Sequence, residues 1–179
     1  MKHTFIIVGP SGSGKTSLGK LLESEGYTKL ITTTNRPIRP GEIDGVDYYF
    51  ITETYTENLK RFGIEHNYIS VTNYGDHFYG LRADEFMRKY TPEHKYIILD
   101  YKGALEYEEN FEDCIIVYMD VDESTVKKRM EARGDTPEDI NKRLGTYAQE
   151  TKQMSELKQE GRAIVLDANE SIEHLLELL

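Results

Sequence analysis

The chain has 179 residues, of which 38% are hydrophobic and 30% charged, a composition that fits one packed domain. Its net charge of −10 disfavours general binding to DNA or RNA, and no apolar stretch is long enough for a membrane-spanning helix. The single cysteine, Cys114, excludes an intramolecular disulfide framework. We therefore expect a soluble cytoplasmic protein without a signal peptide and without membrane or nucleic-acid partners.

Four short apolar runs alternate with helical patterns along the chain. The runs, at residues 3–9, 95–101, 114–121 and 162–168, are nearly continuous in apolar character, as buried parallel strands are. Helical patterns cover residues 14–26, 122–134, 136–157 and 171–179, with stop signals at Gly26 and Gly134. This alternation predicts an α/β fold in which helices flank a parallel central sheet.

Residues 32–82 have a different pattern. The tyrosine-rich segments VDYYFI and NYISVTNYGDHFYGL alternate in polarity, and the second is expected to turn at Gly75 and Asp76. These features predict a small antiparallel lobe inserted into the parallel sheet.

The segment GPSGSGKTS, residues 9–17, follows the first apolar run and opens the first helix. It fits the P-loop pattern G-x-x-x-x-G-K-[ST], in which glycines let backbone N–H groups turn toward phosphates at a helix N-terminus. We predict ATP and Mg²⁺ as ligands, with Lys15 reaching the β- and γ-phosphates and Thr16 holding the metal. The alternative is a flexible Gly/Ser turn with a surface lysine. The predicted nucleotide-binding residues are Gly9, Ser11, Gly12, Ser13, Gly14, Lys15, Thr16 and Ser17.

Two further sites carry groups that suit phosphate and metal. Arg36 and Arg39 flank Pro37, and two guanidinium groups at fixed spacing suit a phosphate monoester, although solvated surface arginines are the alternative. Asp100 ends the second predicted parallel strand, at the edge where such sheets bind ligands. Its carboxylate suits Mg²⁺ or the water shell of that ion, and a helix cap or turn is the alternative role.

The P-loop, the segment TTTNRPIRPGEIDGVDYYF, the Tyr79–Gly80 pair, Asp100 and the RMEARG segment together resemble the guanylate kinase family over nearly the whole chain. The resemblance implies a P-loop kinase that transfers a phosphoryl group from ATP to GMP. It also implies one domain, residues 1–179, with a core (1–31, 83–121 and 158–179), a monophosphate-binding lobe (about 32–82) and a helical lid (about 122–157). Nucleotides are then the partners, and we expect a monomer or a homodimer.

The resemblance also implies roles for individual side chains. The residues that hold the acceptor phosphate are Arg36, Arg39, Tyr48 and Tyr79, those at base-reading positions are Thr32 and Ser70, and the lid arginines that close over the ATP phosphates are Arg129, Arg133 and Arg143. The alternatives are ordinary aromatic packing for the tyrosines and intrahelical ion pairs, for example with Glu131, for the lid arginines.

The base-reading positions depart from the family pattern. Ser70 stands where the family has an acid, unless an insertion brings Glu65 there. The segment LDYKG is two residues shorter than its family counterpart, and Lys102 falls near the position of a second acid. Three functions therefore stay open: a guanylate kinase with a rearranged base site, a kinase for another monophosphate or a phosphorylated sugar, and a non-catalytic binding module.

Overall fold

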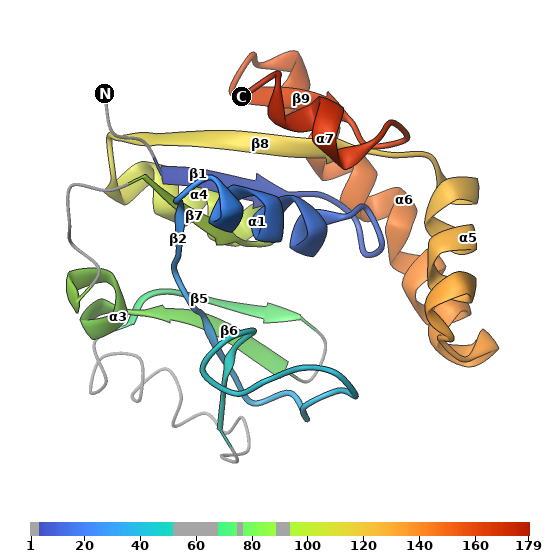
Figure 1. Ribbon diagram of the computed structural model, residues 1–179, viewed down its shortest axis with the longest axis horizontal. Helices are drawn as coiled ribbons and strands as arrows, with labels where there is room; N and C mark the ends of the chain where they lie inside the picture. The colour runs from blue at the N-terminus through green and yellow to red at the C-terminus, as the bar shows by residue number, and fades with distance from the viewer. Residues whose placement is uncertain (1–3, 52–67, 75–76, 89–93) are drawn as a thin grey trace.

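A computed structural model describes residues 4–51, 68–74, 77–88 and 94–179. It contains two sheets with helices around the larger one (Figure 1). The strands are β1 (Thr4–Val8), β2 (Thr28–Lys29), β3 (Thr33–Thr34), β4 (Tyr49–Phe50), β5 (Tyr68–Tyr74), β6 (His77–Arg82), β7 (Lys95–Ile98), β8 (Cys114–Asp120) and β9 (Ala163–Asp167). The helices are α1 (Lys15–Ser24), α3 (Ala83–Arg88), α4 (Tyr101–Asn110), α5 (Glu123–Arg133), α6 (Pro137–Gln159) and α7 (Ile172–Leu176).

The larger sheet is parallel throughout, in the order β2-β7-β1-β8-β9. The predicted parallel core is confirmed, and the four apolar runs of the sequence form β7, β1, β8 and β9. Strand β2 was not predicted because a two-residue strand is too short to show a periodic pattern. The central place of β1 puts the loop that follows it at the carboxyl edge of the sheet, where such sheets bind ligands.

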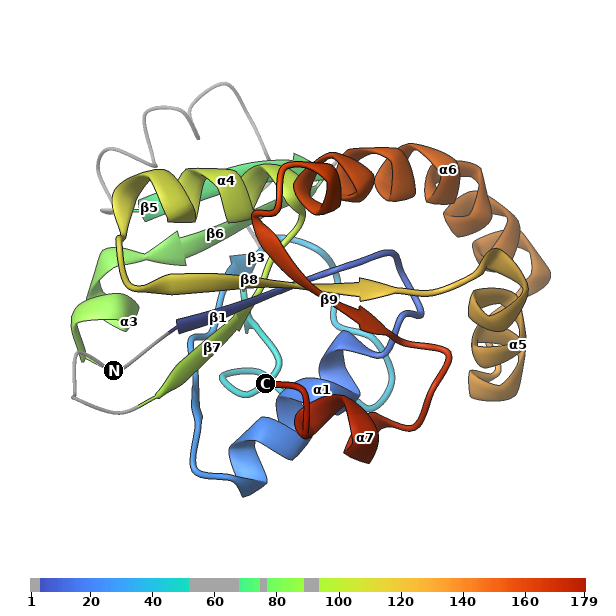
Figure 2. The ribbon, with the colours of Figure 1, turned by 90° about the horizontal axis from the view of Figure 1, so that it is seen from above.

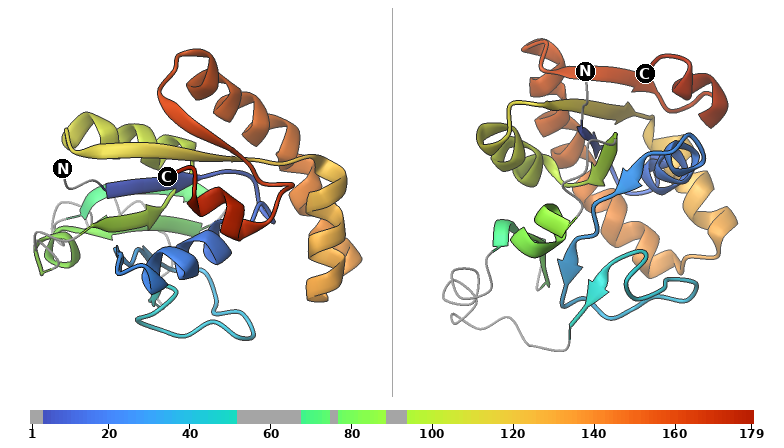
Figure 3. Two further views of the ribbon diagram at one scale, coloured as in Figure 1. Left: turned by 45° about the horizontal axis from the view of Figure 1, so that its top comes forward. Right: turned by 60° about the vertical axis from the view of Figure 1, so that its left-hand side comes forward.

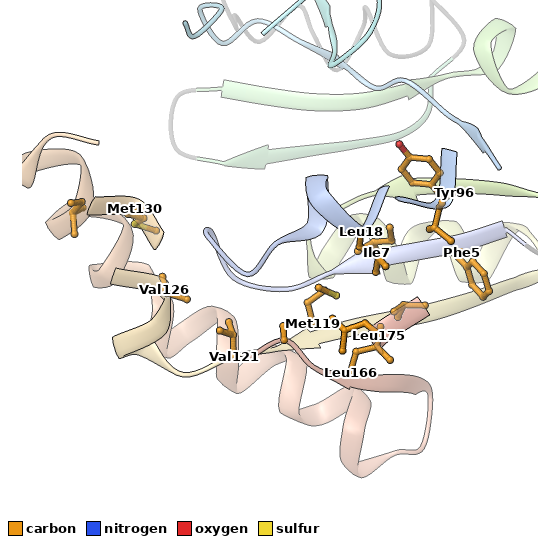
Figure 4. Packing of buried hydrophobic residues seen from close by; sticks show 14 residues of the cluster. Phe5, Ile7, Leu18, Tyr96, Met119, Val121, Val126, Met130, Leu166 and Leu175 are labelled. Carbon is orange, nitrogen blue, oxygen red and sulfur yellow. The ribbon is translucent and has the colours of Figure 1, made fainter. Parts of the chain in front are cut away.

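Both faces of the larger sheet are buried under helices. Figure 2 shows α1 and α7 on one face and α4 and α6 on the other. Side chains of β1 alternate between them: Phe5 and Ile7 belong to the cluster under α1 and α7, whereas Ile6 and Val8 belong to the cluster under α4 and α6. Figure 4 shows the first cluster, in which Leu18 and Leu175 pack against strand residues. Burial on both faces explains why these strands read as continuous apolar runs.

The helix ends follow the capping signals of the sequence. The Asp122 side chain caps α5 by accepting a hydrogen bond from the Thr125 N–H, and Gly134 ends the helix in a left-handed conformation. Thr136 caps α6 directly before Pro137. Figure 3 shows the α5–α6 pair extending beyond the end of the larger sheet. Within the described ranges, none of the helices combines the length and apolar character needed to cross a bilayer.

The smaller sheet has the order β4-β3-β6-β5. The β3–β6 and β5–β6 pairs are antiparallel as predicted, but β3 and β4 pair in parallel. Residues 35–48 connect them and are numerous enough for the crossover that parallel pairing requires. The predicted turn at Gly75 and Asp76 and the alternative base reader Glu65 lie outside the described residues.

Candidate active site

The P-loop of residues 9–14 joins the buried strand β1 to α1, as the motif requires. Gly9, Gly12 and Gly14 all have positive φ angles, of 151°, 82° and 98°. A Cβ atom on Gly9 would lie 2.9 Å from both the Met119 carbonyl oxygen and the Ser13 Oγ atom, so a side chain does not fit there. The loop therefore has the glycine-dependent backbone that a phosphate cradle needs, while Thr16 and Ser17 are exposed in the first turn of α1.

Lys15 folds back onto the loop. Its Nζ atom donates hydrogen bonds to the carbonyl oxygens of Gly9 (2.7 Å) and Pro10 (2.8 Å). Burial lowers the pKa of Lys15 to about 8, with the nearby Glu150 carboxylate raising it and the Arg143 charge lowering it further. The Glu150 carboxylate also accepts a hydrogen bond from the Ser11 N–H at 3.4 Å. A carboxylate from α6 thus lies against one backbone N–H of the loop, a group of the kind that binds phosphate.

The first arginine of the lobe, Arg36, is buried and held by a carboxylate. Its side chain is 7% exposed, and its two terminal nitrogens donate to the two oxygens of Glu42 at 3.0 and 2.8 Å. The guanidinium also lies over the rings of Tyr48 and Phe50, with its central carbon 5.3 and 5.5 Å from the ring centroids. Its Nε atom is buried without a hydrogen-bond partner among the described residues. A carboxylate and two aromatic rings thus hold the Arg36 cation in one place.

Three further residues complete the group around Arg36. The Tyr48 and Tyr79 rings meet edge to face, with centroids 5.9 Å apart. The backbone N–H of Arg39 donates to the same Glu42 carboxylate at 2.8 Å, while the Arg39 side chain is exposed. The structure therefore brings the four predicted phosphate-binding residues, Arg36, Arg39, Tyr48 and Tyr79, into one place on the lobe.

Arg143 connects this group with the P-loop. Desolvation of its guanidinium by neighbouring groups and the charges of Arg36 and Arg143 lower the pKa of Arg39, and the Arg143 charge also lowers the pKa of Lys15. Arg143 therefore lies within electrostatic reach of both the P-loop lysine and the arginines of the lobe. Lys15, Arg143, Arg39 and Arg36 are thus a series of neighbouring cations, with the carboxylates of Glu150 and Glu42 among them.

The other two predicted lid arginines have protein partners. Arg129 donates to the backbone carbonyl oxygens of Ser13 (3.2 Å) and Ala168 (2.7 Å), which ties α5 to the P-loop and to the end of β9. Arg133 pairs with Asp135 next to the end of α5. The hydrogen bond from Arg133 lowers the pKa of Asp135, and the charges of Arg143 and Arg39 lower it further, so the Arg133–Asp135 pair lies within electrostatic reach of Arg143. Arg129 is held against the P-loop backbone at Ser13.

Asp100 begins α4. Its Oδ1 atom accepts a hydrogen bond from the Gly103 N–H at 2.7 Å, so the residue does cap a helix. This bond uses one carboxylate oxygen, and a carboxylate offers a second to a cation or its water shell. In the described ranges there is no group of three or more His, Cys, Asp or Glu side chains arranged for a metal ion. The hydroxyl of Thr16 and the carboxylate of Asp100 are oxygen donors of the kind that Mg²⁺ takes, and this ion usually keeps several waters and binds substrate phosphates.

The base-reading positions lie deeper in the lobe. Thr32 and Ser70 are 5% and 6% exposed. The Ser70 hydroxyl donates to a carboxylate oxygen of Glu106 on α4 at 3.1 Å, and Lys102 pairs with the other oxygen of Glu106 at 3.7 Å. A carboxylate is therefore present beside Ser70, but it comes from a helix that the sequence analysis did not predict.

Comparison with known proteins identifies the family of the chain. The sequence pattern of the family described as guanylate kinase matches residues 1–179. The chain belongs to the guanylate kinase family. It is 35% identical to a guanylate kinase of Thermus thermophilus over 144 residues, an alignment that covers 78% of this chain and 64% of that relative. The chain thus spans slightly less than two thirds of the length of this relative.

Other relatives and solved structures extend the comparison. A guanylate kinase of Nitrosococcus oceani is 32% identical over 160 residues, with 85% of this chain and 76% of the relative covered. A crystal structure of guanylate kinase from Anaplasma phagocytophilum matches with a TM-score of 0.68 and 21% identity, covering 98% of this chain and 81% of that chain. A gluconokinase structure from Sinorhizobium meliloti matches at a TM-score of 0.51 and 17% identity, covering 98% and 88%. These structural matches show the P-loop kinase fold.

Three acidic residues of this guanylate kinase family member were missed by sequence reasoning. Glu42 was part of a recognised segment, but its role depends on the turn that brings it back to Arg36. Glu150 and Glu106 lie in sequence far from the residues they contact, Ser11 and Ser70. For Glu106, one signal was available in the sequence. Asp100 as a helix cap predicts that α4 begins there, and the position of Glu106 on that helix follows.

Proposed function

We propose that the protein is an enzyme that transfers the γ-phosphoryl group of ATP to GMP, giving GDP and ADP. The observation that carries this proposal is the loop after β1, in which Gly9, Gly12 and Gly14 have the positive φ angles of a phosphate cradle. A donor phosphate on this loop and an acceptor phosphate on the lobe arginines would meet near Arg143, whose charge acts on both Lys15 and Arg39. Phosphoryl transfer requires several positive charges around the phosphoryl group that moves between the two nucleotides.

In the proposed reaction, an oxygen of the acceptor phosphate attacks the γ-phosphorus in line while the bond to the ADP oxygen breaks. Lys15 and Arg143 stabilise the charge on the transferred group, and Arg36, Arg39, Tyr48 and Tyr79 hold the acceptor phosphate. Thr16 and Asp100 would hold Mg²⁺, which neutralises charge on the phosphate oxygens when bound. Arg129 supports the P-loop backbone, and Arg133 stays a proposed lid residue that must leave Asp135 to reach phosphate.

We further propose the division into a core (1–31, 83–121 and 158–179), a monophosphate-binding lobe (about 32–82) and a lid (about 122–157). Closure of lobe and lid with both substrates present would limit transfer of the phosphoryl group to water. Small-molecule nucleotides are the proposed partners, and a cytoplasmic monomer or homodimer is the proposed setting.

A second acceptor is a specific alternative, because Ser70 and Lys102 stand at base-reading positions where the family resemblance implies acids. The test is ADP release from ATP and Mg²⁺ with GMP, dGMP, AMP, CMP, UMP and phosphorylated sugars as acceptors. Lys15→Ala serves as the blank, and Lys20→Ala, an exposed lysine of the same helix, as the matched control.

Turnover with GMP and dGMP that disappears in Lys15→Ala and persists in Lys20→Ala would support the proposal. Turnover with another acceptor, without turnover of GMP or dGMP, would show that the site takes that other substrate. ATP binding without turnover of any acceptor would favour a binding module.

A further inference from the structure

Glu106 brings a carboxylate to the strand of the lobe that faces the core. Its Oε2 atom accepts a hydrogen bond from the buried Ser70 hydroxyl at 3.1 Å, and the Lys102 ammonium lies 3.7 Å from Oε1. The Glu106 side chain nevertheless keeps 32% of its surface exposed. A carboxylate has about four acceptor positions on its two oxygens, so these two contacts leave capacity for a ligand.

The packing of α4 on β5 fixes where this carboxylate lies. Gly103 and Glu106 are three residues apart and share one face of α4. A Cβ atom on Gly103 would lie 3.4 Å from the Thr72 methyl carbon, an ordinary van der Waals distance, so this face of α4 packs directly against β5. The same face therefore presents Glu106 to Ser70, two residues before Thr72.

The register of the small sheet relates Glu106 to the proposed acceptor-phosphate residues. Thr72 pairs with Tyr79 across β5 and β6, and directly paired residues point to the same face of a sheet. Ser70 is two positions farther along β5, a distance of about 7 Å at ordinary strand spacing. A mononucleotide whose phosphate contacts Tyr79 would have its base on the side of the lobe where Ser70 and Glu106 lie.

We infer that Glu106 is a specificity-determining residue that reads the base of the acceptor nucleotide, with Lys102 as its partner; this inference rests on the proposed function. Guanine presents two adjacent donors, N1–H and the 2-amino group, which match the two acceptor oxygens of a carboxylate. The O6 atom beside N1 is an acceptor and suits the ammonium of Lys102. Glu106 thus supplies acceptors for N1–H and the 2-amino group, and Lys102 supplies a donor for O6, in the order in which these groups follow one another on guanine.

Other purines fit this pair less well. Adenine has an acceptor at N1 and an amino group at position 6. Its N1 acceptor would face the Glu106 carboxylate, and its amino donor would face the Lys102 ammonium, so neither pair can form a hydrogen bond. Hypoxanthine keeps N1–H and O6 but lacks the 2-amino donor. The order of affinity at this site is therefore GMP, then IMP, then AMP.

The test measures dissociation constants for GMP, IMP and AMP by calorimetry, together with KM and kcat in ATP turnover, for the wild type and Glu106→Gln. A glutamine keeps the shape but replaces one acceptor oxygen with a donor. We expect GMP affinity to fall about 10- to 100-fold, IMP affinity to fall less, and the GMP/IMP ratio to approach 1. KM for ATP stays within about twofold, because the P-loop is not touched.

Two further variants complete the design. Glu109→Gln, an exposed carboxylate on the same helix, is the matched control and should leave all three affinities unchanged. Lys102→Met, at a side chain 70% exposed, should keep the fold and weaken GMP and IMP alike.

The outcomes separate this inference from the proposed function. A wild type that does not phosphorylate GMP overturns both. A wild type that does so, while Glu106→Gln keeps the GMP/IMP ratio, overturns only the role of Glu106. If Glu106→Gln does not fold, Lys102→Met decides, and unchanged GMP affinity in that variant overturns the inference.

Discussion

The substitution Glu42→Gln tests whether one carboxylate holds the arginines of the lobe in place. Glu42 accepts two hydrogen bonds from the Arg36 guanidinium and one from the Arg39 N–H. The side chains of Arg36 and Glu42 are 7% and 20% exposed. A glutamine occupies the same space, but it carries no charge and turns one acceptor into a donor that faces another donor.

The expected loss of stability follows from this burial. Removing one partner of a buried ion pair costs about 3–5 kcal/mol, because the remaining charge loses its compensation. The amide oxygen of glutamine still accepts one bond and Glu42 is partly exposed, so we expect a loss of about 2–3 kcal/mol in the free energy of unfolding. For a chain of this size, the loss lowers Tm by roughly 5–10 °C.

The loss of stability in Glu42→Gln depends on pH. Burial opposes ionisation of Glu42, but the hydrogen bonds from Arg36 and Arg39 and their charges outweigh it, so the pKa of Glu42 lies below its ordinary value. An acid with a lowered pKa in the folded state stabilises the fold above its unfolded pKa, and the contribution is lost as the pH falls through the folded pKa. The difference between wild type and variant is therefore complete at pH 7 and shrinks below about pH 4.

Urea denaturation at pH 7 and about pH 3 measures the stability, and initial rates measure KM for GMP and ATP. We expect KM for GMP to rise about tenfold because Arg36 and Arg39 lose their shared anchor, while KM for ATP stays unchanged. Glu25→Gln, an exposed carboxylate at the end of α1, is the control. Unfolding free energies at pH 7 that agree within about 0.5 kcal/mol between wild type and Glu42→Gln would refute the reasoning.

Three further predictions follow from the site and the core. Since the pKa of Lys15 is about 8, ATP binding at pH 8 should take up about half a proton, visible as a buffer-dependent binding enthalpy by calorimetry and absent in Lys15→Ala. Gly9→Ala places a methyl group 2.9 Å from the Met119 carbonyl at a positive φ, so ATP affinity should fall at least about tenfold in direct titration, and an unchanged affinity would contradict the assigned loop geometry. Burial and the charges of Glu108 and Asp113 raise the pKa of Cys114 to about 11, so alkylation by iodoacetamide at pH 8 should be roughly 100-fold slower in the native protein than in urea.

Much of the core could be predicted because its signals are local. Strands buried on both faces read as continuous apolar runs, and β1, β8 and β9 were found from that pattern alone. The P-loop is equally local, since the positive φ angles at Gly9, Gly12 and Gly14 demand glycine wherever the loop occurs. The caps at Asp122 and Thr136 and the stop at Gly134 likewise act within a few residues.

The sequence by itself thus determined the fold class and the glycine-rich loop after β1, and it predicted the arginines and tyrosines that the structure brings together on the lobe. Only the tertiary structure decided which carboxylates act on them: Glu42 on Arg36, Glu150 on the P-loop and Glu106 on Ser70. The physical reason is distance along the chain. Propensities, caps and loop glycines depend on neighbours a few residues away, whereas the partner of a buried charge is set by how helices and strands pack, and α4 and α6 bring their carboxylates from remote segments.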